Sequence, residues 1–242
     1  MPPQRASQTA RARVFEDMHR GGEPFDYSRR AAEILRHRFI SDLVRALVPR
    51  PARLLDVGCS KGQLTVHLAA VPEFVVAVDL SRAAIRAARE RLQSGGAGVH
   101  FVVADATALP FGASRFDIVV MSDGLHSWQL PAAERRAALV QAGYVVRAGG
   151  HAVLTEYLQP RAFAEFVSEV RASPFQVVAV EYLHDRLWYR VESWFKAVRD
   201  WRWVERLFAS VPVARLLGRV ARLFGRRGSR HICVVARRAV TD

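Results

Sequence analysis

Short apolar runs alternate with stretches of helical character along the chain from residue 27 to residue 238. Apolar side chains recur three and four positions apart over 27–48, as on one face of a helix, and further helices are predicted over 83–92 and 132–146. Continuous apolar runs are typical of strands buried on both faces, and they occur at 54–57, 75–80, 102–103, 116–122, 151–157, 176–183 and 231–236. This alternation predicts an α/β domain with a mostly parallel sheet.

The stretch 53–65 is predicted to be a buried strand, a tight loop and the start of a helix. Gly58 and Gly62 allow the backbone to bend and to approach a ligand closely. The helix begins near Leu64, so its free N–H groups face the loop, as in sites that hold a nucleotide-like group. No third glycine accompanies these two at the position that contacts a pyrophosphate, so the stretch is not the G-x-G-x-x-G dinucleotide motif. It is not a Walker loop either.

Asp56, Gly58 and Gly62 match the first motif of the class I S-adenosylmethionine-dependent methyltransferases, Asp-x-Gly-x-Gly-x-Gly, with Ser60 in place of the middle glycine. Three further stretches resemble later sequence motifs of this family. They occur in the same order and at similar spacing along the chain. They are the strand 75–80 with Asp79, the stretch 102–111 with Asp105 and Leu109-Pro110-Phe111, and the strand 116–122. Because four motifs occur in the family's order and at its spacing, the resemblance is specific.

The resemblance implies roles for the two acids at strand ends. Asp79 would accept hydrogen bonds from the ribose hydroxyls of the cofactor, and Asp105 would accept one from the adenine amino group. Without a cofactor, Asp79 would be a helix N-cap with Ser81, and Asp105 a turn acid before Pro110. The residues assigned to S-adenosylmethionine are Asp56, Gly58, Cys59, Ser60, Gly62, Asp79, Leu80, Asp105, Ala106 and Ser122.

The resemblance also implies a Rossmann-like, doubly wound α/β sheet of seven strands with an antiparallel last strand. We expect an N-terminal helical extension, a helical insertion between the sixth and seventh strands, and a Gly149-Gly150 turn before the fifth. Residues 1–26 are predicted to be flexible, without regular structure before residue 13. The methyltransferase domain is predicted to span 27–238, with the cofactor-binding core at 53–158 and the insertion at 184–229.

The 242 residues carry a formal net charge of +13, and Lys61 and Lys196 are the only lysines. Arginine favours anionic partners and bidentate contacts, although a GC-rich genome also enriches it. No run of 18 or more apolar residues and no signal-type N-terminus occurs, so we expect a cytoplasmic protein that does not span a membrane. Cys59 and Cys233 predict neither a disulfide nor a zinc site, and no metal is expected.

Residues 186–230 hold most of the positive charge, a net +9, together with four of the five tryptophans. One apolar helical stripe precedes Pro212, and a second follows it up to Phe224. The second stripe is flanked by Arg215, Arg219, Arg222 and Arg226. Such a stripe is typical of a helix lying in an anionic membrane surface. It is equally typical of a lid helix packed on its own domain, and the sequence leaves both interpretations open.

Methyl transfer needs an acceptor atom held in line with the sulfonium methyl group, with or without a base. His126, after the fourth strand, is the leading candidate for a catalytic base because neutral histidine accepts a proton near pH 7. The helix over 27–48 is expected either to cover a sheet edge or to bring Tyr27, Arg30 and His37 to the cofactor. Other candidates at carboxyl ends of strands, where ligands bind in such sheets, are Asp123, Glu156, Tyr157, His184 and Asp185.

The leading hypothesis is methyl transfer to O, N or C of a small metabolite or lipid-like acceptor, reached at the inner face of the membrane. The stretch 105–111 also resembles the branch that includes ubiquinone and menaquinone methyltransferases. RNA is an alternative that the charge suggests, but Thr155-Glu156 stands where RNA ribose methyltransferases need a lysine. A scaffold or regulatory module that binds the cofactor without catalysis is a second alternative, and the oligomeric state stays open.

Overall fold

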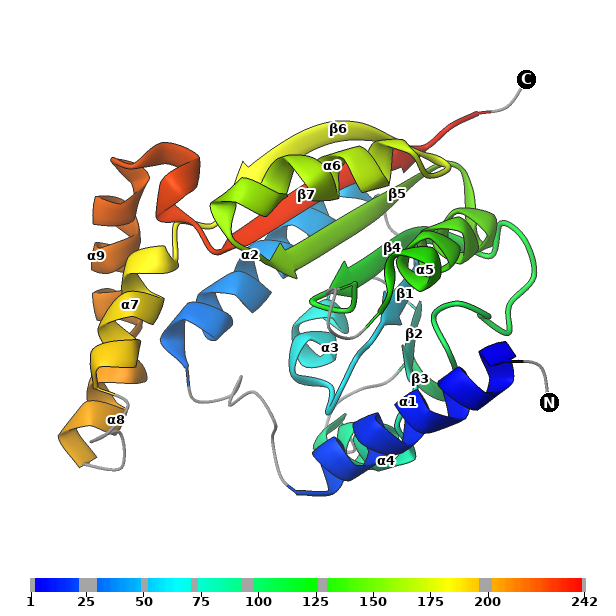
Figure 1. Cartoon of the computed structure of the whole chain (residues 1–242), viewed down its shortest axis with the longest axis horizontal. Coiled ribbons are helices and arrows are strands. Elements are labelled where there is room, and N and C mark those ends of the chain that lie inside the picture. Colours follow the sequence, from blue (N-terminus) through cyan, green and yellow to red (C-terminus); the bar gives the residue numbers. More distant parts are fainter. Residues whose placement is uncertain are drawn as a thin grey trace.

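The centre of the structure is a sheet of seven strands in the order β3-β2-β1-β4-β5-β7-β6 (Figure 1). The structure is a computed structural model that describes residues 3–21, 30–48, 52–70, 74–92, 98–125, 130–195 and 202–240. The strands are β1 (Arg53–Val57), β2 (Phe74–Asp79), β3 (Val99–Val103), β4 (Phe116–Ser122), β5 (Val146–Tyr157), β6 (Phe175–Tyr182) and β7 (His231–Arg238). β7 pairs antiparallel with β5 and with β6, and the other strand pairs are parallel, which confirms the predicted antiparallel last strand.

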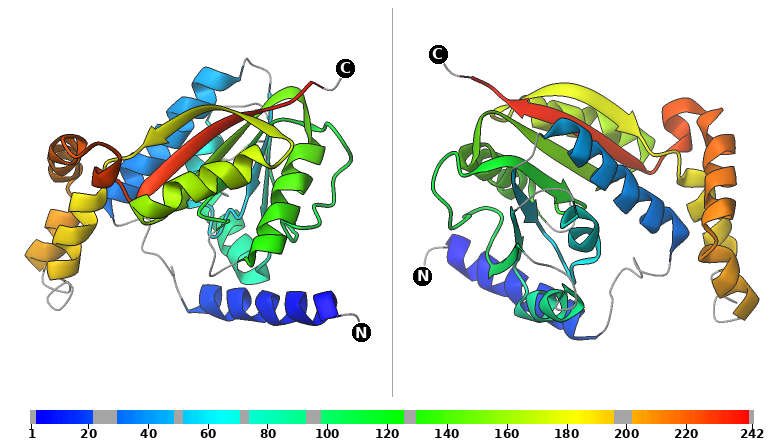
Figure 2. Two further views of the ribbon diagram at one scale, coloured as in Figure 1. Left: turned by 45° about the horizontal axis from the view of Figure 1, so that its top comes forward. Right: turned by 180° about the vertical axis from the view of Figure 1, so that it is seen from behind.

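Helices cover both faces of the sheet (Figure 1, Figure 2). Side chains alternate between the faces along each strand, so Leu54 packs on one side and Leu55 on the other. The Leu54 side is covered by α2 (Ala31–Leu47), α3 (Gln63–Leu68) and α4 (Arg82–Leu92). The Leu55 side is covered by α5 (Ala132–Val145) and α6 (Phe163–Arg171). The sheet is therefore buried on both faces, as its continuous apolar runs predict.

The insertion between β6 and β7 lies at one end of the sheet and is helical, as predicted (Figure 2). It comprises α7 (Arg186–Trp194), α8 (Arg202–Phe208) and α9 (Val211–Arg222). Its apolar cluster is separate from the two layers of the sheet and is shared with the start of α2; it contains Ala31, Ala32, Trp188, Val204, Phe208 and Ala214. Among the helices that the structure describes, none has the length and apolar character needed to cross a membrane.

An N-terminal helix, α1 (Pro3–Arg20), corrects the expectation of an irregular segment before residue 13. The helix lies beside α4 at the edge of the sheet (Figure 1, Figure 2). Glu16 joins the two helices, because its Oε2 accepts hydrogen bonds from the Ser81 hydroxyl (2.9 Å) and the Ala83 N–H (3.0 Å). The sequence of α1 has no clear apolar stripe, so its order depends on such tertiary contacts rather than on local periodicity.

The two glycines before the fifth strand do not form the expected separate turn. Instead, β5 begins at Val146 and includes Gly149 and Gly150, and its register with β4 shifts between Phe116 and Ile118. A Cβ atom at Gly150 would lie 2.7 Å from the carbonyl oxygen of Asp117. The glycines therefore form an irregularity inside a strand, where the backbones approach too closely for a side chain.

Gly62 lies at the start of α3 with a left-handed backbone, at φ +77°. A Cβ atom there would lie 3.1 Å from Cβ of Ala88 and 3.2 Å from Cδ1 of Leu92, both on α4. Glycine at this position allows the loop after β1 to pack directly against α4.

We expect Gly62→Ala to lower the free energy of unfolding more than Gly225→Ala does. Both positions have a positive φ, which costs alanine about 1–2 kcal/mol, but nothing lies within 4 Å of a Cβ at Gly225. Overpacking against α4 should add roughly 1–3 kcal/mol at Gly62 alone. Urea unfolding of both variants without ligand measures the difference, and equal losses would show that the contact with α4 is not tight.

Candidate functional site

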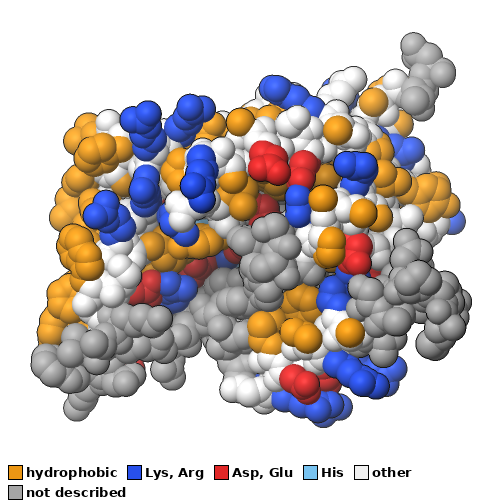
Figure 3. Space-filling model, in the orientation of Figure 1, with side chains coloured by type: hydrophobic (Ala, Val, Ile, Leu, Met, Phe, Trp, Pro, Cys, Tyr) orange, Lys and Arg blue, Asp and Glu red, His pale blue; other side chains and the backbone are white. Residues whose placement is uncertain are grey.

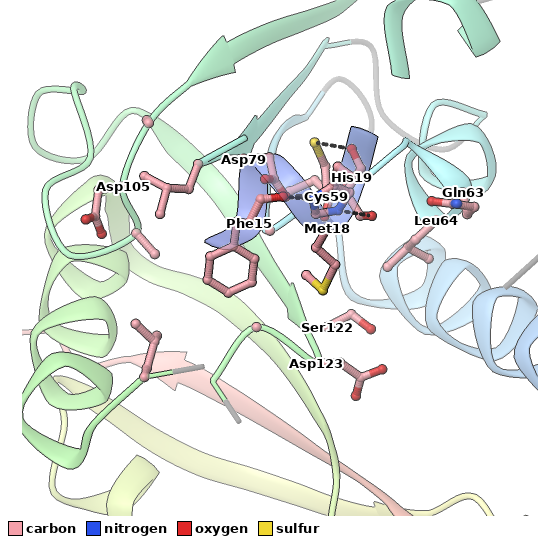
Figure 4. A pocket seen from close by; sticks show the side chains of 18 of the residues that line it. Phe15, Met18, His19, Cys59, Gln63, Leu64, Asp79, Asp105, Ser122 and Asp123 are labelled. Carbon is pink, nitrogen blue, oxygen red and sulfur yellow. Dashed lines mark hydrogen bonds between the residues drawn. The ribbon is translucent and has the colours of Figure 1, made fainter. Parts of the chain in front are cut away.

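A pocket opens at the carboxyl ends of β1, β2, β3 and β4, where ligands bind in sheets of this kind. Its walls are the loop between β1 and α3, the residues that follow β2, β3 and β4, and parts of α1 and α2. In Figure 4, Phe15 and Met18 project from α1 into the space between Asp105 on one side and Ser122 on the other. α1 therefore closes one side of the pocket.

The loop after β1 is held in place by backbone hydrogen bonds to the end of β2. The N–H groups of Gly58 and Cys59 both donate to the Val78 carbonyl, at 2.8 and 3.0 Å. Ser60 has a left-handed backbone, at φ +49°. That conformation explains why glycine is the usual residue at this place in the motif, and serine occupies it at a cost in strain. His19 of α1 contacts the same residue, with Nε2 lying 3.0 Å from the Ser60 Oγ.

Asp79 ends β2 and ties the two loops together. Its Oδ2 accepts the Ser60 N–H and its Oδ1 accepts the Ser81 N–H, both at 2.9 Å. Burial raises the pKa of this carboxyl above its usual value. The cap of α4 is the Ser81 hydroxyl, which accepts the Ala84 N–H at 3.0 Å. Each Asp79 oxygen can accept a further hydrogen bond, so the carboxylate can still receive the hydroxyl groups of a ligand.

Asp105 follows β3 on the opposite side of the pocket. Its Oδ1 accepts hydrogen bonds from the N–H and the hydroxyl group of Thr107, at 2.9 and 2.8 Å. Asp105 therefore also stabilises the turn before Pro110, the alternative role that its sequence position allows. Its Oδ2 accepts Nη2 of Arg11 at 2.5 Å, and Arg11 also pairs with Glu134 on α5. In this arrangement, an adenine amino group would compete with Arg11 for Asp105.

Asp56 is buried near the end of β1 and lines the pocket. Its Oδ2 accepts the Thr65 hydroxyl at 2.7 Å. Burial raises the pKa of Asp56 to about 7, which the hydrogen bond from Thr65 only partly offsets. The side chain therefore anchors the start of α3 beneath the loop.

The structure brings most of the predicted cofactor residues together. Nine of them line the pocket: Asp56, Gly58, Cys59, Ser60, Asp79, Leu80, Asp105, Ala106 and Ser122. Gly62 faces α4 instead, and the proposed base His126 lies outside the described residues. The pocket wall also contains residues that sequence reasoning missed, namely Arg11, Phe15, Met18, His19, Arg36, Gln63 and Leu64. Those on α1 carry no motif or periodic signal, so only the docking of that helix reveals them.

The lining fits S-adenosylmethionine in its chemistry. Carboxylates at the ends of β2 and β3 suit hydroxyl and amino groups, and Phe15 and Met18 supply an apolar wall for a ring. A Cβ atom at Gly58 would lie 3.8 Å from Cα of Gly124, so the loops after β1 and β4 approach closely and narrow the pocket there.

Next to this pocket, a buried charge network extends from the end of β4 into α2. Nη1 of Arg36 donates to the Ser122 Oγ at 2.5 Å and lies 2.9 Å from the Asp123 Oδ2. Nε and Nη2 of Arg36 donate to Glu33 Oε2 at 2.9 and 2.7 Å. Burial opposes the ionisation of Asp123 and Glu33, but the charge of Arg36 lowers the pKa of both carboxyl groups below their usual values.

The network continues into β7 and the insertion. His231 Nδ1 bonds to the Asp185 carboxylate, and its Nε2 lies 3.6 Å from Asp123 Oδ2. The Tyr189 hydroxyl donates to Glu33. Burial opposes protonation of His231, but the Asp185 and Asp123 carboxylates raise its pKa to about 10. The histidine is therefore a cation at neutral pH and stabilises carboxylates rather than accepting a proton.

The remaining strand-end candidates have structural contacts. Tyr157 packs its ring against His231, with centroids 5.1 Å apart. The His184 N–H donates to the Ser229 hydroxyl at 2.8 Å. Arg30 pairs with Glu192 of α7 rather than with a pocket residue, whereas His37 does line the pocket and Tyr27 lies outside the described residues. Within the described ranges, no three His, Cys, Asp or Glu side chains are placed to hold a metal ion.

Comparisons with known proteins agree with this geometry. A family model described as "Methyltransferase domain" matches residues 54–150. A demethylmenaquinone methyltransferase of Clavibacter sepedonicus is 34% identical over 170 residues, which cover 63% of this chain and 67% of that protein. A 27-O-demethylrifamycin SV methyltransferase of Amycolatopsis mediterranei (strain S699) is 30% identical over 59% of this chain and 55% of its own length.

Two solved structures extend the likeness of fold to nearly the whole chain. The N-methyltransferase NodS from Bradyrhizobium japonicum, in complex with S-adenosylhomocysteine, has a TM-score of 0.67 at 14% identity and covers 94% of this chain and 98% of its own. The 1,6-didemethyltoxoflavin-N1-methyltransferase of Burkholderia thailandensis has a TM-score of 0.65 at 20% identity, covering 99% and 92%. At these identities, the likeness shows the fold alone.

Asp79→Ala should weaken the binding of S-adenosylhomocysteine by about a hundredfold or more, because it removes a charged acceptor of hydrogen bonds. Calorimetric titration measures the affinity, and thermal unfolding checks that the variant is folded. Asp117→Ala is the matched control, because Asp117 lies at the other end of β4 and pairs with Arg147. Unchanged affinity in Asp79→Ala would contradict the placement of the cofactor.

The stability of the wild type should fall between pH 7 and pH 10. The folded pKa of His231 lies above its unfolded value, so its stabilisation is complete below about pH 6.5 and is lost as the pH rises towards 10. His231→Gln should be less stable at pH 7 and should show a smaller loss over this range, by at least ~1 kcal/mol. Urea unfolding at a series of pH values measures the free energy of unfolding of both proteins and its slope against pH.

His151→Gln is the control for this pH dependence. His151 lies on β5 near Arg237 and Arg147, and burial together with these arginines lowers its pKa below 6.5. This variant should therefore keep the wild-type slope between pH 7 and pH 10. Equal slopes in wild type and His231→Gln would show that His231 is not the titrating cation.

Proposed function

This chain belongs to the class I S-adenosylmethionine-dependent methyltransferases, and we propose that its acceptor is a small, largely apolar molecule reached at a membrane surface. The chain is an enzyme, and S-adenosylmethionine is its cofactor. The proposed location at the membrane depends on one observation, an outward apolar row on α9 between exposed arginines.

Within the pocket, the residues of this chain have distinct tasks. S-adenosylmethionine supplies the reactive methyl group, bonded to a positively charged sulfur. Asp79 and Asp105 would hold its ribose and adenine, and Phe15 and Met18 would exclude water from one side. The acceptor would enter beside Ser122 and Asp123, at the end of β4. Rate enhancement would then come largely from holding the acceptor atom in line in a site from which water is excluded.

The names of the similar proteins do not agree on which kind of atom receives the methyl group. Their names refer to a quinone in one case, to an oxygen in another and to a nitrogen in a third. We therefore propose an acceptor with an apolar body, methylated at O, N or C. The pocket supports this class because many of its lining side chains, such as Leu64 and Leu130, are apolar.

The second apolar stripe of the insertion is divided between the two sides of α9. Ala214 and Ala221 are buried, and Leu217 packs into the same apolar cluster as Ala214. On the other side, four apolar residues face solvent: Leu216, Val220, Leu223 and Phe224 are 60%, 40%, 84% and 64% exposed. A lid helix packed on its domain would bury such a row, so packing within the chain does not account for it.

Arginines lie beside this exposed row. Arg215, Arg219, Arg222 and Arg226 recur at helical spacing and are all exposed. Figure 3 shows hydrophobic and basic side chains side by side along the edge of the molecule that α9 forms. Apolar side chains flanked by arginines suit the boundary between acyl chains and anionic headgroups. We therefore assign this face, Leu216 to Arg226, to contact with an anionic bilayer.

The acceptor class is tested by incubating the protein with methyl-labelled S-adenosylmethionine and a cell extract. The label should appear in the lipid or organic phase and should be absent when Asp79→Ala replaces the wild type. Label confined to RNA would contradict the proposal and favour a nucleic acid substrate. Label in no fraction, with cofactor binding intact, would favour a module without catalysis.

The membrane contact is tested by flotation with vesicles. The wild type should float with phosphatidylglycerol–phosphatidylcholine vesicles and not with phosphatidylcholine alone. Arg215→Glu/Arg219→Glu should weaken binding at least tenfold, since each arginine near an anionic surface contributes about 1 kcal/mol. Leu223→Ser/Phe224→Ser should also weaken it, because apolar burial is lost.

The matched control for flotation is Arg82→Glu/Arg86→Glu. These two arginines are exposed on α4, away from the insertion, and their reversal changes the net charge by the same amount. This variant should float like the wild type. If it loses binding as strongly as the α9 variant, overall charge rather than the α9 face is responsible. A wild type that binds neither kind of vesicle removes the membrane from the proposal.

A further inference from the structure

We propose that Asp123 binds a hydroxyl group of the methyl acceptor, so that the enzyme selects apolar molecules that carry an O–H group at the reacting end. This inference rests on the proposed function and names the polar part of its substrate. The geometry that carries it is a buried carboxylate oxygen at the wall of the pocket that has no hydrogen-bond partner among the described residues.

One oxygen of Asp123 is fully engaged, and the other is not. Oδ2 lies 2.9 Å from Nη1 of Arg36 and 3.6 Å from Nε2 of His231. Oδ1 is buried and has no hydrogen-bond partner among the described residues. A buried carboxylate oxygen is costly when it accepts no hydrogen bond. Because Asp123 lines the pocket, a ligand with a donor group can supply the missing bond.

The backbone holds Asp123 in this orientation. Its N–H donates to the Thr155 carbonyl at 2.8 Å, and its φ of +55° lies in the left-handed region. Such strain persists only where the surroundings impose it, and it often occurs at functional sites. Figure 4 shows Asp123 beside Ser122, across the pocket from Asp79. Asp123 therefore lies in the same pocket as the predicted cofactor residues, at the side away from Asp79.

A second unpaired oxygen lies nearby. Ser122 and Thr155 are register partners in β4 and β5, so the next residues, Asp123 just after β4 and Glu156 near the end of β5, lie close together. Glu156 Oε1 accepts the Leu125 N–H at 2.5 Å, whereas Oε2 is buried without a partner among the described residues. Burial, with the charge of Asp123, raises the pKa of Glu156 well above its usual value, whereas the charge of Arg36 overcomes burial and lowers the pKa of Asp123. Of the two acids, Asp123 is therefore the one that the surroundings hold as a charged acceptor at this end of the pocket.

The rest of the pocket defines the body of the ligand. Phe15, Met18, Leu64 and Leu130 contribute apolar surface to the same pocket. An apolar ring with one hydroxyl group satisfies both parts of the pocket, since its O–H donates to Oδ1 and the ring covers the apolar wall. Arg36 and His231 act as positioning residues, because they engage Oδ2 and leave Oδ1 as the acceptor for the ligand.

The test uses 1-naphthol and 1-fluoronaphthalene, which have the same ring and substituents of similar size but differ in the hydrogen-bond donor. Fluorescence titration measures the affinity of each in the presence of saturating S-adenosylhomocysteine. The wild type should bind 1-naphthol at least about tenfold more tightly, as expected for a hydrogen bond to a charged group. Equal affinities, or binding of neither probe, would overturn the proposal.

Asp123→Asn gives the sharper comparison. Its amide oxygen should face Arg36 and the His231 cation, which leaves the NH₂ group at the position of Oδ1. The site then offers a donor in place of an acceptor, so the preference for 1-naphthol should fall to about twofold or less. A preference that survives unchanged in this variant would overturn the assignment to Asp123.

Two controls separate this inference from the proposed function. Asp117→Asn removes an acid at the other end of β4 and should keep the wild-type preference. S-adenosylhomocysteine binding is measured first in every variant and should stay within about twofold of the wild type in Asp123→Asn. A wild type that binds no S-adenosylhomocysteine contradicts the proposed function itself, whereas normal cofactor binding without the naphthol preference contradicts only the hydroxyl site.

Discussion

Carboxylates are buried where the parallel strands end, and each needs a partner because an unpaired buried charge is costly. Asp56 accepts a hydrogen bond from the Thr65 hydroxyl on α3, and Asp79 accepts N–H groups from the loops after β1 and β2. Asp123 is paired from outside those loops, by Arg36 on α2 and His231 on β7. The pairing of these acids therefore decides how the elements around the pocket dock on the sheet.

The same network connects the pocket to the insertion. Glu33, which pairs with Arg36, also accepts a hydrogen bond from Tyr189 of α7, and His231 pairs with Asp185 at the start of that helix. α9 packs on α7 and α2, so the face proposed to contact the membrane belongs to the same packed unit as the proposed acceptor end of the pocket.

The cofactor loop could be predicted from the sequence because its signals are local. A buried strand, glycines at fixed spacing and an acid at the end of the next strand are all encoded within short stretches, and nine of ten predicted cofactor residues line one pocket. Gly62 shows the limit of this reasoning, because its positive φ and its contact with Ala88 concern packing against α4. The glycines of β5 show the same limit, because they lie inside a strand where a turn was expected.

Hydrophobic periodicity and turn residues act over a few positions, so the alternation of buried strands and helices and the tight loop after β1 could be read directly from the chain. The antiparallel last strand followed from the resemblance to the family. Three features followed only from the packing of the elements: α1 closes the pocket, Arg36 and His231 hold Asp123, and the apolar residues of α9 are divided between a buried and an exposed side. These features pair residues far apart in the chain, and their burial and charge balance exist only once the elements are packed together.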